Sequence, residues 1–428
     1  MGLAVVVAYL ALNLLSPAEM FPALALFRIS LILGLASLPL AVVTRLQSPE
    51  IGKLRTQFLL VILFFVWASC SWLPHGWIGG NLATVLEISP NIIMFFVGVV
   101  FFRSPFRLGL IRGTMVLVAI YVIAVSLSQL SYARASGEST PYVMAGASQD
   151  PGGETAGANE VRIRGLGMLN DPNIFGQYLL LILPLLFVST KKNGLGPGYF
   201  VVIPLAILFA IGIYLTGSRG AETGLAVLIG LFLIRRFKKA GAVFSVVFGS
   251  LTLLAINAFR SRTVSLSGGM DRLAIWSEGM QYVKSSPVWG IGIRSFADRE
   301  GMTAHNSYLL CAAELGMVGF FFWMAIIVVT IIQLNRVPKV VGKVNPPLAR
   351  WAIALKLSLG GYLFTSFFLS CTYNLLLFLL LGMSGAVITA AGGDDAIPLR
   401  GTKWQAWSAA FCGGILALIY VMLRLRIA

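Results

Sequence analysis

The stretch DRLAIWSEGMQYVKSSPVWGIGIRSFADREGMTAHNSYLLCAAELGMVG, which runs from Asp271 to Gly319, separates two long apolar parts of the chain. It holds one of only two histidines, His305. Apolar segments of about 20 residues are typical of membrane-spanning helices. We therefore expect this polar stretch to lie at a membrane surface, with most of the remaining chain serving as its scaffold.

The composition predicts a membrane protein of the all-α class. Of the 428 residues, 58% are hydrophobic and 11% are charged, and the mean hydropathy is +0.87. The apolar runs predict a polytopic transmembrane helical bundle of 12–13 helices, which forms a single domain over residues 1–428. The predicted helices are 3–15, 22–43, 57–73, 82–102, 107–130, 172–190, 199–216, 219–235, 240–258, 306–334, 351–371, 374–390 and 405–424.

The distribution of charge predicts how the bundle is oriented. The formal net charge is +16, but the basic residues are dispersed among short loops, which argues against nucleic acid as a partner. More than half of the 32 basic residues fall on alternate connections, and the positive-inside rule assigns these connections to the cytoplasm. Arginines on the opposite, periplasmic side break this rule, so they need a separate explanation. The side on which the C-terminus lies is left open.

Two long connections fall on the periplasmic side. Residues 131–169 are rich in glycine, serine and alanine, which predicts a mobile loop. Residues 259–305 are predicted to form the catalytic loop. Within it, Trp276, Met280 and Val283 recur at helical spacing, which predicts a short amphipathic helix on the periplasmic membrane surface.

The motif TGSRGAE places Arg219 in the first turn of a predicted helix that Ser218 can cap. A cation at the positive end of a helix dipole is unfavourable, so an anion is expected nearby. Glu222 on the same helix face can supply it. The alternative is a bound phosphate, which a helix N-terminus also favours. Arg272 stands in the first turn of the amphipathic helix, where it can bind either a lipid headgroup or a substrate.

His305 and Asn306 stand where a long apolar helix is predicted to begin, with Asn306 as its cap. A histidine at a membrane surface can be neutral near pH 7 and accept a proton, so His305 is a candidate general base. The plainer alternative is an interfacial histidine held by hydrogen bonds. The other histidine, His75, is assigned to a loop among aromatic residues.

Arg162 and Arg164 precede the sequence NDPN, residues 170–173. Their guanidinium groups can add to an anion-binding site, with Asn170 and Asn173 as hydrogen-bonding groups at a helix start. No carboxylate cluster typical of a Mg²⁺ or Mn²⁺ site is visible, so we predict no metal and no cofactor. The four cysteines form no CxxC pair and are expected to be core residues.

In their order, these motifs resemble the O-antigen ligase and polymerase superfamily. GSRG is followed by R-x-x-x-W, P-x-x-G-x-G, HN-S-Y-L and E-L-G-x-x-G over roughly residues 200–335, and NDPN resembles an element that precedes this signature. The resemblance implies a GT-C-like glycosyltransferase of the bacterial inner membrane. It would act on the periplasmic face and use a glycan on undecaprenyl pyrophosphate as donor.

The resemblance also implies roles for individual residues. Arginines that match Arg219 and Arg272 hold the pyrophosphate without metal in ligases of this family, and a histidine that matches His305 serves as base. This predicts a single inverting displacement, in which the base takes a proton from the acceptor hydroxyl. The arginines, joined by Arg164, stabilise the leaving pyrophosphate. The expected acceptor is a sugar of lipid A–core, and both substrates are anchored in the membrane.

Three alternatives remain at this point. A polymerase of O-antigen or exopolysaccharide and a protein O-oligosaccharyltransferase would use the same donor and share the same signature. A flippase for the lipid-linked glycan belongs to a different class, and such proteins usually place polar groups at the bilayer midplane in broken helices. The charges that membrane topology does not explain cluster near the periplasmic surface and not at the midplane, which favours a transferase, and among transferases we expect a ligase.

Overall fold

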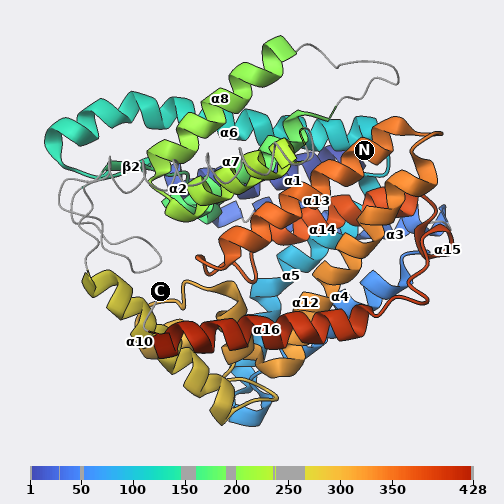
Figure 1. The fold of residues 1–428 in the computed structure, drawn as a ribbon. Helices are drawn as coiled ribbons and strands as arrows, with labels where there is room; N and C mark the ends of the chain where they lie inside the picture. Colours follow the sequence, from blue (N-terminus) through green and yellow to red (C-terminus); the bar gives the residue numbers. More distant parts are fainter. Residues whose placement is uncertain are drawn as a thin grey trace.

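The computed structural model describes residues 2–27, 29–48, 53–145, 161–188, 199–234, 237 and 266–425 (Figure 1). Nearly all regular structure in these ranges is α-helical, which confirms the predicted all-α bundle. The helix predicted at 240–258 lies outside the described residues. The long helices are α1 (Gly2–Leu15), α3 (Ile29–Leu46), α4 (Arg55–Ser69), α5 (Ile78–Phe101), α6 (Pro105–Ser136), α7 (Pro172–Leu186), α8 (Tyr199–Thr216), an unlabelled helix at 219–234, α12 (Ser307–Val341), α13 (Pro346–Ser366), α14 (Leu375–Ala390) and α16 (Trp404–Leu425).

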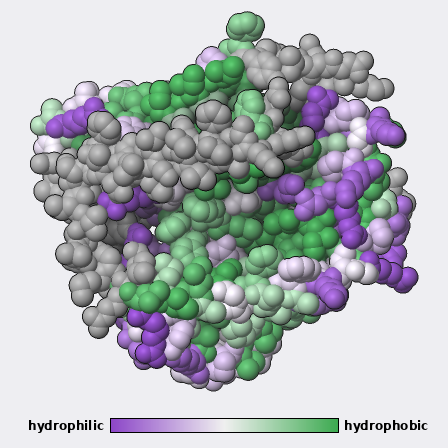
Figure 2. All heavy atoms as spheres, in the orientation of Figure 1, coloured by the Kyte–Doolittle hydropathy of each residue, from purple (hydrophilic) through white to green (hydrophobic). Residues whose placement is uncertain are grey.

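Six helices in the described part of the chain are long and apolar enough to cross a membrane. They are α3 with the residues before it, α4, α5, α6, α12 and α16. Figure 2 shows hydrophilic residues mainly toward the left and right margins of the molecule, with a hydrophobic region between them. This distribution is typical of a protein that crosses a bilayer several times, so the chain is a multi-pass membrane protein.

The centre of the bundle is α14, in which every residue from Leu375 to Thr389 is buried. This helix packs on α5, α12 and α13. Gly98 of α5 and Gly382 of α14 let the two backbones approach closely, because a Cβ on Gly98 would lie 3.1 Å from Gly382 Cα. Small residues at such crossings are typical of helix packing in membranes.

Polar connections gather at one end of the bundle, which we call the His305 end. In Figure 1, β2 and α10 mark this end on the left, whereas α15 (Gly393–Ala396) and the N-terminus lie on the right. Five features make up the His305 end: the turn with η3 (Leu73–His75), the strands β1 (Val143–Ala145) and β2 (Val161–Ile163), the turn before residue 219, the helices α10 (Leu266–Ser285) and α11 (Ser295–Glu300), and the connection from α13 to α14.

The flanks of the segment predicted to be a mobile loop contain a two-stranded antiparallel sheet. β1 pairs with β2, with Val143 opposite Ile163 and Ala145 opposite Val161. The sequence does not predict this sheet, because strands of three residues are too short to show an alternating pattern. Residues 146–160 lie outside the described residues.

The long helix α12 is interrupted at Gly316, where φ is 66° and ψ is −176°. The interruption leaves two carbonyl groups free to accept hydrogen bonds from outside the helix. Ile291 N donates to Ala313 O at 2.9 Å, and Gly292 N donates to Glu314 O at 3.0 Å. The loop after α10 is therefore bonded side-on into the break.

Candidate active site

The helix at 219–234 begins with the turn predicted around Ser218. Gly217 has a φ of +70°, which glycine adopts without steric cost. Ser218 Oγ accepts from the backbone N–H three residues later at 3.3 Å, which confirms the predicted cap. Arg219 is exposed in the first turn, whereas Glu222 is buried with 7% of its surface exposed. An anionic ligand at the His305 end can therefore reach the guanidinium group of Arg219.

Arg162 and Arg164 have different neighbours, although only one residue separates them. Arg162 is buried, its Nε donates to Thr216 O at 2.8 Å, and its NH2 group donates to Asn173 Oδ1 at 2.9 Å. Arg164 follows the end of β2, and its NH2 group donates to Thr140 O at 3.3 Å, beside β1. The structure thus brings Arg162 to the turn between α8 and the next helix, whereas this contact of Arg164 lies at the sheet.

The NDPN sequence forms the start of α7, as predicted, but its aspartate is the cap. Asp171 Oδ1 accepts from Asn173 N at 2.7 Å. The side chain of Asn173 instead accepts from Arg162. Asn170 precedes the cap and ends the short helix η4 (Gly167–Leu169). Asn173 is therefore hydrogen-bonded to Arg162, and Asn170 is the residue before the N-cap of α7.

His305 precedes α12 in a backbone conformation that is unusual for its residue type. Its φ is +46°, in the left-handed region, and only 6% of the residue is exposed. Non-glycine residues with positive φ cost energy and concentrate at functional sites. Asn306 Oδ1 accepts from Tyr308 N and Leu309 N, both at 3.0 Å, which confirms Asn306 as the cap of α12. The imidazole therefore stands on a fixed backbone at a helix start.

The predicted amphipathic helix is present as α10, and it is bonded directly to the His305 segment. Trp276 Nε1 donates to Ala304 O at 2.9 Å. The helix begins at Leu266, so Arg272 lies in its second turn and not in the first turn as predicted. Arg272 stands one helical turn before Trp276 and is partly buried, so both residues lie on the same face of α10. At the other end of α10, Tyr282 donates to Glu300 of α11, and this bond raises the pKa of Tyr282.

Residues 367–374 connect α13 to α14, and we call them the 367–374 link. Ser307, in the first turn of α12, holds this link in place. Its hydroxyl donates to Leu369 O at 2.5 Å and accepts from Cys371 N at 2.9 Å. Its carbonyl accepts from Thr372 Oγ1 at 2.8 Å. The link is therefore fastened two residues from His305.

The 367–374 link also touches the two elements that bear the candidate arginines. A Cβ on Gly220 would lie 3.4 Å from Phe368 Cβ, so the first turn of the helix at 219–234 contacts the link. The ring of Phe367 packs edge-on against Trp276 of α10, with 5.7 Å between centroids. The elements that carry Arg219, Arg272 and His305 therefore converge on one short segment.

Hydropathy does not predict this link, because the apolar run extends the preceding predicted helix to residue 371. The helix ends at Ser366, five residues earlier. Leu369 O, Cys371 N and Thr372 Oγ1 are bonded to Ser307, which hydropathy cannot reveal because the partner lies more than 60 residues away. A signal was present, since SCTYN is a polar run between two apolar helices.

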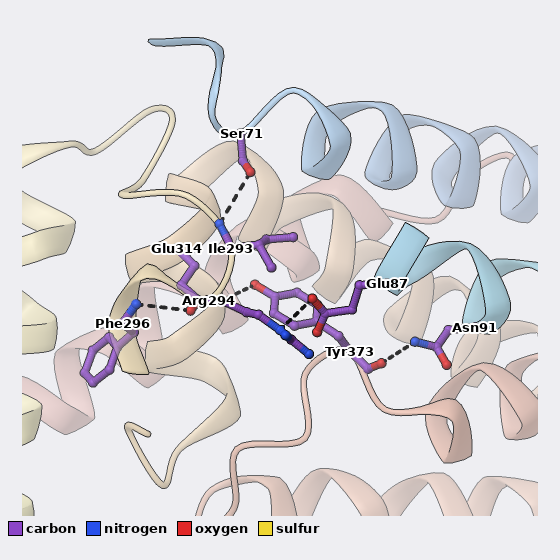
Figure 3. A network of polar contacts seen from close by, with 8 residues as sticks. All are labelled: Ser71, Glu87, Asn91, Ile293, Arg294, Phe296, Glu314 and Tyr373. Carbon is purple, nitrogen blue, oxygen red and sulfur yellow. Dashed lines mark hydrogen bonds and ion pairs between the residues drawn. The ribbon is translucent and has the colours of Figure 1, made fainter. Parts of the chain in front are cut away.

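A buried polar network ties the loop after α10 to the link (Figure 3). Glu314 of α12 is 2% exposed. Its Oε1 accepts from Phe296 N at 3.4 Å, and its Oε2 accepts from Tyr373 OH at 3.0 Å. Tyr373 O in turn accepts from Asn91 Nδ2 of α5 at 2.6 Å. A carboxyl group within a membrane helix is costly without partners, and these bonds fix α5, α11, α12 and the link relative to one another.

The glycine-rich loop after α10 also packs against the end of α4 and the turn between α4 and α5. Trp289 stacks on Trp67, with 4.2 Å between ring centroids and 9° between ring planes. His75 Nε2 lies 3.0 Å from Gly290 O, and its ring lies 6.0 Å from that of Trp72. His75 therefore lies in a turn among aromatic side chains, as predicted, where it supports the loop.

The chemistry available at the His305 end is that of guanidinium and imidazole groups. Guanidinium groups stay charged and bind phosphate oxygens in pairs, and an imidazole can accept a proton near neutral pH. Among the residues that the structure describes, no three histidine, cysteine, aspartate or glutamate side chains are grouped as metal ligands. The arrangement suits the binding of an anionic leaving group beside a proton acceptor.

Comparison with known families places this site in a recognised segment. Residues 204–324 match the family model described as O-antigen ligase. The matched segment contains Arg219, Arg272 and His305, and it confirms the resemblance that the motifs indicate. A comparison with curated proteins found no match.

Proposed function

On the premise that this chain carries the signature segment of the O-antigen ligase superfamily, we propose that it is a glycan ligase. It transfers a glycan from undecaprenyl pyrophosphate to a sugar hydroxyl of lipid A–core. The His305 end then faces the periplasm of a bacterial inner membrane, and the opposite end faces the cytoplasm. One observation supports this function most: the elements bearing Arg219, Arg272 and His305 meet at the 367–374 link.

The reaction is a single inverting displacement at the anomeric carbon. His305 removes the proton from the acceptor hydroxyl, and the oxygen attacks the anomeric carbon from the face opposite the pyrophosphate. The bond from this carbon to the pyrophosphate oxygen breaks, and its electron pair leaves with the undecaprenyl pyrophosphate. Arg219 and Arg272 stabilise the developing negative charge, because preorganised guanidinium groups bind it more strongly than water does.

Arg162, Arg164, Asn170 and Asn306 are assigned supporting roles in this proposal. Arg162 donates to Thr216 O and so stabilises the turn before Arg219, which positions the guanidinium group of Arg219. Asn306 fixes the first turn of α12 directly after the base. Arg164 is assigned to the pyrophosphate beside Arg219 and Arg272, and Asn170 to a hydrogen bond with the same substrate.

The base assignment is tested with purified protein, a lipid-linked glycan donor and lipid A–core. We expect His305→Ala to lower the rate of transfer about 100-fold or more, because a positioned base contributes on that order. His305→Asn should lose as much rate, although asparagine tolerates a positive φ better than alanine. Donor binding should persist in both variants. Near-normal turnover in either variant would remove His305 as the base.

The same assay separates the proposed ligase from its relatives by its products. A ligase joins the glycan to lipid A–core. A polymerase lengthens the glycan that is still attached to undecaprenyl pyrophosphate, and a flippase moves the carrier across vesicles without changing any covalent bond. Carrier-linked chains that grow, with no joined product, would replace the ligase proposal by the polymerase.

A further inference from the structure

An ion pair between Arg294 and Glu87 lies near Tyr373, which belongs to the 367–374 link (Figure 3). Arg294 Nε and Glu87 Oε2 are 2.6 Å apart. The side chain of Arg294 is 70% exposed and that of Glu87 is 30% exposed. A guanidinium group has five N–H donors, and one carboxylate engages at most two of them. The pair therefore orients Arg294 while leaving it able to bind a second anion.

The backbone beneath Arg294 is held more firmly than an ordinary surface loop. Arg294 has a φ of +66°, in the left-handed region that non-glycine residues rarely adopt. Its neighbours Ile293 and Ser295 are each 2% exposed. Phe296 N donates to the buried Glu314, and Ile293 N donates to Ser71 Oγ at 3.4 Å. The charged side chain is thus the exposed part of a fixed segment.

The ion pair lies within the membrane depth of α5, some way along the helix from its start at the His305 end. α5 begins at Ile78, and Glu87 follows nine residues later, about 13 Å along the helix axis. Ile78, Leu82 and Leu86 are more than 60% exposed, so one face of this half of α5 would meet lipid. A charged pair at this depth is costly in hydrocarbon and normally borders a polar space or a substrate pathway. This position is where the headgroup of a membrane-anchored molecule would enter from the side.

The position along the link indicates which substrate this pair would meet. Phe368, at one end of the link, touches the helix that begins with Arg219. Tyr373, at the other end, is bonded to Asn91 and Glu314 beside the ion pair. The base segment is fastened between them through Leu369, Cys371 and Thr372. A base between two substrates has the donor on one side and the acceptor on the other.

We propose that Arg294, oriented by Glu87, binds a phosphate group of the acceptor lipid at this lateral position. The inference rests on the proposed ligase function, in which Arg219 and Arg272 bind the donor. It adds a second anion site with a separate task, because it places the acceptor hydroxyl toward His305 without touching the leaving group. Glu87 is a positioning residue in this scheme.

The test compares Arg294→Gly with the wild type, using lipid A–core that is either intact or treated with phosphatase. Glycine suits a φ of +66°, so this variant removes the guanidinium group without straining the loop. We expect the KM for the intact acceptor to rise about tenfold or more, with kcat and the KM for the donor changed less than about twofold. The wild type should show the same rise in KM when the acceptor has lost its phosphates, and Arg294→Gly should not respond to their removal.

Arg299→Ala is the matched control, because Arg299 is an exposed arginine of α11 five residues farther along, over the ring of Tyr282. This variant removes the same charge from a neighbouring position, and its KM for the acceptor should stay near the wild-type value. Glu87→Gln should raise the KM for the acceptor less than Arg294→Gly does, since the guanidinium group remains but is less well oriented.

Three results would overturn the inference. A rise in the KM for the donor would assign Arg294 to the pyrophosphate. Equal use of intact and dephosphorylated acceptor by the wild type would remove phosphate as the ligand. An effect that follows the phosphatidylglycerol content of nanodiscs, independent of the acceptor, would assign the site to membrane phospholipid. Failure of the ligase function itself would look different, since the wild type would then form no joined product at all.

Discussion

At the scale of single residues, two glycines allow the loop after α10 to lie in the break of α12. Gly290 and Gly316 have φ values of +73° and +66°. A Cβ on Gly290 would overlap the carbonyl group of Glu314, and a Cβ on Gly316 would overlap the carbonyl group of Val288. Backbone atoms cannot rotate away as a flexible side chain can, so both positions exclude larger residues.

We expect Gly316→Ala to lower the free energy of unfolding by at least about 1–2 kcal/mol, from the left-handed conformation alone. Thermal unfolding in detergent measures this, and the rate of transfer should fall with it. Gly360→Ala is the matched control, because Gly360 lies within α13 with open space around it. That variant should be as stable as the wild type or slightly more stable. Equal losses in the two variants would contradict the role assigned to the break.

The pair Arg162 and Arg164 shows at the same scale what a sequence pattern does not reveal. Both arginines were predicted near one anion site from their position ahead of NDPN. The strand β2 ends at Ile163, so the alternation that would point both side chains the same way stops between them. Arg162 reaches the turn after α8, and a described contact of Arg164 lies beside β1. The two side chains diverge because the pairing of β2 with β1 ends at Ile163, and the sequence alone does not show where this pairing ends.

At the scale of elements, the 367–374 link holds together helices that are far apart in the sequence. Hydropathy and caps predict the helices themselves, including the starts at Ser218 and Asn306, because these signals are local. The link depends on hydrogen bonds between segments more than 60 residues apart, for which a single sequence has no periodic signal. Each helix start could therefore be predicted, but not the segment that gathers them.

Ser307→Ala should test this link. The change leaves the amide of Cys371 and the carbonyl of Leu369 without their hydroxyl partner. A buried polar group that loses its partner costs about 1–3 kcal/mol, so we expect a loss of stability of that size and slower transfer. Ser384→Ala is the control, since the Ser384 hydroxyl is buried but bonds only within its own helix, to Leu380 O at 2.6 Å. A similar loss of stability in both variants would show that the 367–374 link does not depend on the hydrogen bonds of the Ser307 hydroxyl.

At the scale of the whole molecule, the first and last described residues, Gly2 and Leu425, lie at opposite ends of the bundle. Gly2 of α1 lies against the ring of Phe101, far from the His305 end. At the other terminus, Lys284 of α10 lies over the ring of Tyr420 at 5.9 Å, and Arg424 Nε donates to Tyr420 OH at 2.9 Å. The last helix therefore ends beside α10, at the His305 end of the bundle. The charge distribution of the sequence leaves the side of the C-terminus open, and the structure places the end of α16 on the same side as α10.

Reporter fusions check this arrangement. With the His305 end in the periplasm, alkaline phosphatase fused after the last residue should be active. A fluorescent protein that folds only in the cytoplasm should be bright when fused to the N-terminus. Alkaline phosphatase inserted between α12 and α13, at the opposite end of the bundle, should be inactive and serves as control. Equal behaviour of the two terminal fusions would contradict the opposite placement of the termini.

The stacked indoles of Trp67 and Trp289 provide an intrinsic optical reporter of the loop after α10. Their rings are parallel to within 9° and in direct contact, one on the α4 side and one on the loop. Ultraviolet absorption and emission of each indole depend on the other, so lifting the loop from its seat alters both spectra without any added dye. Rapid-mixing fluorescence during turnover would then show whether the loop stays docked or opens once per catalytic cycle.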